Sequence, residues 1–63
     1  MSLFIRLIDI RINSIFDNKQ NAEKVLQQID FKLKKGIVTE RAYSSDMMEA
    51  VALYRLKVDL LSV

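Results

Sequence analysis

Apolar residues recur at alternating steps of three and four along the first half of this 63-residue chain, and this spacing constrains the fold more than any other feature. The nine positions are Ile5, Ile8, Ile12, Ile15, Lys19, Ala22, Leu26, Ile29 and Leu33, and all of them except Lys19 are apolar. In an α-helix, positions spaced in this way line one side, and that side packs along another helix, as in a coiled coil. The sequence therefore predicts an all-α fold organised around this seam.

The seam keeps its phase across a polar segment, which favours one long helix over about residues 3–35. The helix is expected to end where three lysines precede Gly36, because cations and a following glycine are typical of helix C-termini. Thr39 is the next candidate N-cap. We therefore predict a turn at Gly36–Thr39, a second helix over about 40–61, and an antiparallel helical hairpin that makes up one small domain, residues 1–63.

A three-helix bundle is the alternative architecture. The segment 17–21 (Asp-Asn-Lys-Gln-Asn) contains no apolar residue, and its aspartate and asparagines are good helix caps. A break there would turn the long helix into two and provide a third helix to cover the core.

Each predicted helix carries a second apolar patch nearly opposite the seam, and in a hairpin both patches lie at the open end, far from Gly36. A chain this short builds only a marginal core, and without cysteine it cannot form a disulfide. Soluble monomers rarely expose so much contiguous apolar surface. We therefore expect oligomerisation into a dimer or larger bundle, or binding to a helical protein partner. The predicted interface residues are Leu3, Leu7, Ile10, Leu53, Leu56, Leu60 and Val63.

Enzymatic chemistry is not expected from this composition. The chain has no histidine and no cysteine, so it lacks the usual general base near neutral pH, a thiol nucleophile and the usual zinc ligands. The carboxylate pair Asp46 and Glu49, three residues apart on one helix face, is more simply a solvated surface. We expect a non-enzymatic protein with no cofactor, no metal and no small-molecule substrate.

The leading functional hypothesis is a small protein–protein interaction module, such as an adaptor, co-chaperone, assembly subunit or regulator. The alternative is a dimeric helical bundle that acts as a regulator and binds nucleic acid through basic residues around the turn: Lys32, Lys34, Lys35 and Arg41. The same cations are also explained by the helix dipole, and the net charge of +2 is small. No apolar run is long enough to span a membrane, so a cytoplasmic location is expected.

Overall fold

The computed structural model describes residues 3–17 and 21–62. Within this part the chain forms three α-helices and one 3-10 turn, in the order α1 (Leu3–Ile15), α2 (Ala22–Lys34), η1 (Glu40–Ala42) and α3 (Ser45–Ser62). The all-α prediction is confirmed. The hairpin prediction is wrong, because the continuous helix over 3–35 is divided into α1 and α2, and the structure is the three-helix bundle.

The helix breaks because two residues flanking the joint adopt left-handed backbone conformations. Asp17 has a φ of 56° and Asn21 a φ of 73°, and neither value is compatible with a right-handed helix. Aspartate and asparagine are among the side chains that tolerate this region best. Lys19, the one polar position of the predicted seam, lies between them and outside the described residues.

The predicted turn at Gly36 is confirmed. Gly36 has a φ of 73°, its N–H donates to the carbonyl of Leu33 (3.2 Å), and the Ile37 N–H donates to the carbonyl of Lys32 (3.0 Å). These two hydrogen bonds form a Schellman motif, which satisfies carbonyls that the end of α2 leaves free.

The second predicted helix begins later than expected. Thr39 precedes only the short η1, and α3 starts at Ser45. The reason is a second capping signal, because the Ser44 hydroxyl accepts a hydrogen bond from the Met47 N–H (3.2 Å). The end of α3 at Ser62 agrees with the prediction to within one residue.

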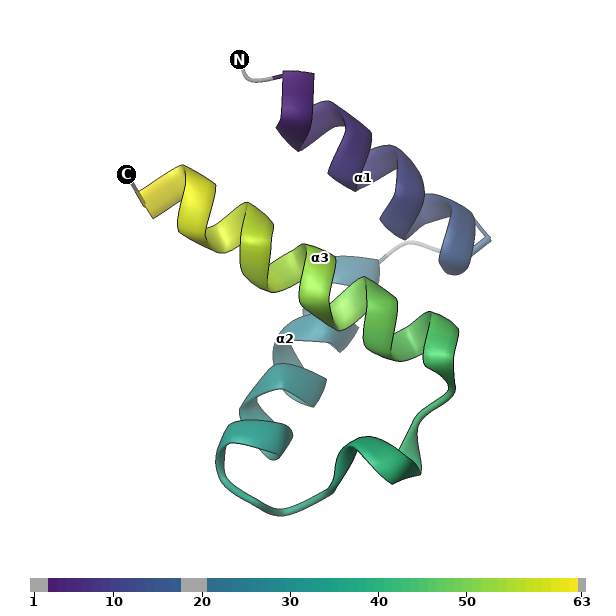
Figure 1. Cartoon of the computed structure of the whole chain (residues 1–63), viewed down its shortest axis with the longest axis vertical. Coiled ribbons are helices and arrows are strands. Elements are labelled where there is room, and N and C mark those ends of the chain that lie inside the picture. Colours follow the sequence, from purple (N-terminus) through teal and green to yellow (C-terminus); the bar gives the residue numbers. More distant parts are fainter. Residues whose placement is uncertain (1–2, 18–20, 63) are drawn as a thin grey trace.

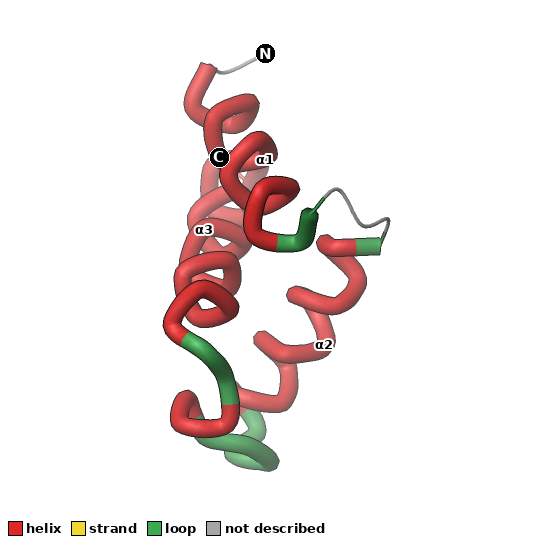
Figure 2. The backbone as a smooth tube through the Cα atoms, turned by 90° about the vertical axis from the view of Figure 1, so that its right-hand side faces the viewer, coloured by secondary structure: helices red, strands yellow, loops and turns green. Residues whose placement is uncertain are grey.

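Helix α3 lies at the centre of the bundle. It packs against both α1 and α2, and Figure 1 shows α1 and α3 side by side and antiparallel, with α2 crossing behind α3. The side view in Figure 2 agrees, with α2 on one side of the α1–α3 pair. The shortest dimension of the molecule, 18 Å, has room for two layers of helix but not three.

The core sits where the three helices meet. Its buried side chains are Ile8, Ile12, Ala22, Leu26, Ile29, Ala50 and Val51. The first five lie on the predicted seam, so the seam prediction is confirmed for both α1 and α2. Tyr43, Met47 and Tyr54 also pack against this cluster, whereas Val58 and Leu61, near the end of α3, are exposed.

Candidate protein-interaction surface

Ion pairs fix how α1 and α3 lie against each other. The Arg11 guanidinium donates to both carboxylate oxygens of Glu49, at 2.6 and 3.0 Å. The Lys57 ammonium donates to Asp9 at 2.7 Å. Since Arg11 and Asp9 lie on opposite sides of the α1 residues that face α3, the two pairs mark the two edges of the α1–α3 seam.

One edge of the seam is covered by α2. The Lys57 ammonium there also donates to Glu23 in the first turn of α2, so one cation joins all three helices. Its side chain is only 13% exposed. Burial by itself lowers the pKa of Lys57, but the hydrogen bonds and charges of Asp9 and Glu23 outweigh it, and the pKa is raised.

The other edge of the seam is apolar beyond the Arg11–Glu49 pair. One helical turn from Arg11 towards the N-terminus lies Leu7, and one turn from Glu49 towards the C-terminus lies Leu53. Further turns in the same directions reach Leu3 and Leu60. Five of the predicted interface residues are 38–71% exposed, and we call them the open face: Leu3, Leu7, Ile10, Leu56 and Leu60. Ile10 projects from the side of α1 opposite the buried Ile8 and Ile12, next to Leu3 and Leu7 on the helix surface.

The open face contains five of the seven interface residues predicted from the sequence. Leu53 differs, because it is only partly exposed and packs against the core. Leu53 projects from the side of α3 that meets α1, which explains its burial. Val63 lies outside the described residues. The long-range ion pairs between α1 and α3 carry no sequence signal, since their partners are 38 and 48 positions apart.

The four residues of the predicted basic group differ in whether they have an acidic partner. Lys34 is paired with Asp30 at 3.2 Å, one turn earlier on α2. Within the described residues, Lys32, Lys35 and Arg41 have no acidic partner. Phe31, beside this basic group, is 56% exposed, and the Lys35 ammonium lies 5.7 Å from its ring centre.

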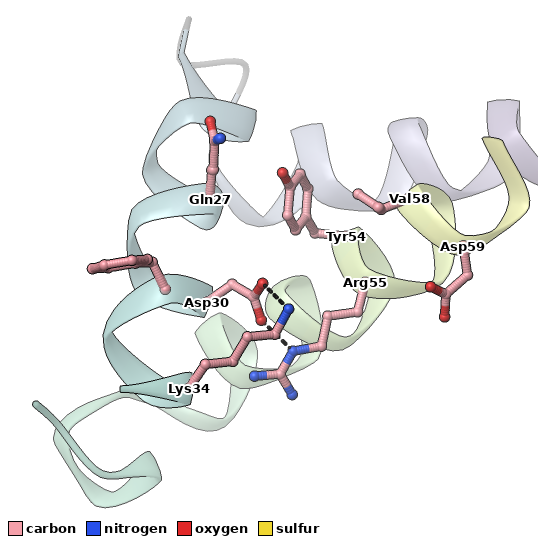
Figure 3. Close-up of a pocket in the computed structure, with 8 residues that line it drawn as sticks. Gln27, Asp30, Lys34, Tyr54, Arg55, Val58 and Asp59 are labelled. Carbon is pink, nitrogen blue, oxygen red and sulfur yellow. Dashed lines mark hydrogen bonds and ion pairs between the residues drawn. The ribbon is translucent and has the colours of Figure 1, made fainter. Parts of the chain in front are cut away.

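A groove of about 280 Å³ runs between α2 and α3 beside Phe31. Figure 3 shows Asp30 in this groove, held by Lys34 and by Arg55 from α3, with Tyr54 and Val58 on the opposite wall. The Arg55–Asp30 distance is 2.5 Å. The groove is lined by two cations, Lys34 and Arg55, and by two carboxylates, Asp30 and Asp59. It therefore has no net charge, which makes it a poor site for an anion.

Acidification should weaken the bundle through Asp30. Burial raises the pKa of this carboxyl, but the hydrogen bonds and charges of Arg55 and Lys34 outweigh it, so its pKa is lowered below 3.8. As the pH falls, Asp30 is therefore protonated in the unfolded chain before it is protonated in the folded chain. Stability is present above the ordinary aspartate pKa and is lost as the pH falls through the lowered pKa of Asp30. Asp30→Asn should flatten this part of the stability–pH curve in urea denaturation. The control Asp59→Asn, at an exposed carboxylate without an ion pair among the described residues, should leave the slope in place.

Comparison with protein-family models, with curated proteins and with solved structures finds no match to this chain. No helix in the described ranges is long and apolar enough to cross a membrane. Over the same residues, no group of three or more acidic, histidine or cysteine side chains is placed to hold a metal ion.

Proposed function

We propose that this chain is a small non-enzymatic protein-interaction module, of the adaptor, assembly-subunit or regulator kind, that binds through the open face. The observation that carries the proposal is the contrast between the two edges of the α1–α3 seam. One edge is closed by α2 and the Lys57 ion pairs. The other presents five aliphatic side chains that no described segment of the chain covers.

The physical reason for association is the cost of this exposure. Apolar patches of a few hundred Å² on a soluble protein mark binding sites more often than bare surface. The open face is also presented by two helices that pack against each other through the core and are joined by ion pairs, so binding orders little additional chain. A helical partner can lay an apolar stripe along such a surface, with the leucines as anchors.

Site-specific photo-crosslinking tests this proposal. A photoreactive amino acid replaces Leu56 on the open face or, as a matched control, Ile37 in the turn after α2, which is also exposed and aliphatic. Expressed in the cells that normally make the chain, the variant at position 56 should give crosslinked products of discrete mass. The variant at position 37 should give none. Equal crosslinking at both positions, or none at either, would contradict the proposal.

Nucleic-acid binding is the second candidate, favoured by one observation. The exposed Phe31 ring lies among Lys32, Lys35 and Lys34, and an exposed ring among cations suits base stacking. The pairing of Lys34 with Asp30 weakens the case, because it reduces the charge offered to phosphates. Binding of this kind would fall steeply with salt and would depend on Lys32 and Lys35, whereas association through the open face would tolerate salt.

A further inference from the structure

We infer that the partner of the open face is a second copy of this chain, in a two-fold symmetric dimer. The inference rests on the proposed function, because it names the occupant of the same surface. The exposed apolar area of the open face and the distribution of charge around it both favour self-association.

The exposed area matches what one half of a stable dimer contributes. Each of the five side chains retains roughly 100 Å² of apolar surface, giving a total on the order of 500 Å². A standard interface buries about 800 Å² per partner, of which roughly 60% is apolar, or again about 500 Å². The open face is therefore large enough for a specific dimer, and no further apolar surface from α2 is needed.

The charge distribution selects this surface for self-association. None of the five side chains is charged, and the adjacent Arg11 and Glu49 neutralise each other. Among the described residues, the charged side chains beside the open face that have no ion pair are Arg6 on α1 and Asp59 on α3, one cation and one anion. The surroundings of the open face therefore carry no net charge, and two copies can meet here without net repulsion. The outer side of α2, by contrast, carries Lys24, Lys32 and Lys35 with no acidic partner among the described residues, and two copies would repel each other there.

Two-fold symmetry also suits the shape of the bundle. The α1–α3 pair forms one layer, with α2 on one side of it. The open face begins at the Arg11–Glu49 edge of this layer, which the Lys57 pairs to α2 do not reach. Stacking two such layers through their open faces places four helices around a new apolar interior, with each α2 on the outside. In this arrangement every open-face residue occurs twice at the interface, so each substitution there acts twice.

Sedimentation equilibrium of the purified chain across a concentration series tests the inference. The natural chain should sediment at twice the chain mass. Leu56→Asp and Leu7→Asp should each raise the dimer dissociation constant at least about 100-fold, because each places two charges in an apolar interface. The control Ile37→Asp, at an equally exposed aliphatic residue in the turn, should dimerise like the natural chain. A monomeric natural chain, or a dimer that resists both aspartates, would overturn the inference.

A second set of variants keeps the test decisive if the aspartates unfold the chain. The natural sequence has no cysteine, so Leu7→Cys and Ile37→Cys each introduce a single thiol. A short bis-maleimide crosslinker should join Leu7→Cys chains into covalent dimers and leave Ile37→Cys chains single. Photo-crosslinked products at position 56 heavier or lighter than two chains would retain an interaction module but overturn the dimer. The absence of products at that position would count against both.

Discussion

Leu26→Ala should lower the free energy of unfolding by about 2–5 kcal/mol, the range for removing a leucine from a packed core. Leu26 is fully buried and projects from α2 into the cluster that α2 shares with α3. Truncation leaves a cavity lined by side chains from different helices, and a core this small has few neighbours to fill it. Because domains of this size are marginally stable, we expect the variant to unfold at a much lower urea concentration than the natural chain. Urea denaturation followed by circular dichroism at a fixed protein concentration measures the change.

The matched control makes the same substitution at a leucine on the surface of the protein. Leu61 lies in the last turn of α3 and is 62% exposed. Since alanine is at least as good a helix former as leucine, Leu61→Ala should change stability by less than about 0.5 kcal/mol. Similar losses in the two variants would mean that Leu26 does not occupy the core.

The core could be predicted from the sequence because helical packing depends on local spacing. Ile8, Ile12, Ala22, Leu26 and Ile29 all lie on the predicted seam and are all buried. The break between α1 and α2 escaped the same reasoning for a physical reason. Both helices turn their apolar side towards α3, so the seam keeps its phase even though the chain leaves the helix between them. The signal for the break was local, in the aspartate and asparagine that adopt left-handed conformations.

The candidate surface was predicted in part because two-sided helices are visible in the sequence. A helix that is apolar on two sides must be covered twice, and the patches on residues 3–10 and 53–60 follow from that alone. What the sequence could not show is which side α2 covers. The covered side is the one where Lys57 pairs with Asp9 and Glu23, which lie far away in the chain and in two different helices. Long-range ion pairs of this kind leave no periodic trace.

Ala50→Leu should destabilise the protein by about 1–3 kcal/mol, the cost of overpacking a filled core. Ala50 and Val51 are both fully buried at the middle of α3, the helix that both others contact. The small side chain of Ala50 allows close packing of the helices at that point. A leucine needs three more heavy atoms of space, which only a shift of a helix can supply. Such a shift also strains the Arg11–Glu49 pair that fixes the α1–α3 register.

The control for this prediction lies two residues further along the same helix. Ala52 is exposed and lies outside the core cluster, so Ala52→Leu adds the same atoms at the surface of α3. Because Ala52 lies one turn before Leu56 of the open face, both leucine variants are compared in the Leu56→Asp background. Leucine and alanine have similar helix propensities, and we expect a change of less than about 0.5 kcal/mol in urea denaturation. Equal tolerance of leucine at positions 50 and 52 would contradict the close approach of the helices at Ala50. That result would also count against the proposed role of the open face. The open face needs α1 and α3 to be tightly packed, because a loosely packed pair has no defined outer surface for a partner to recognise.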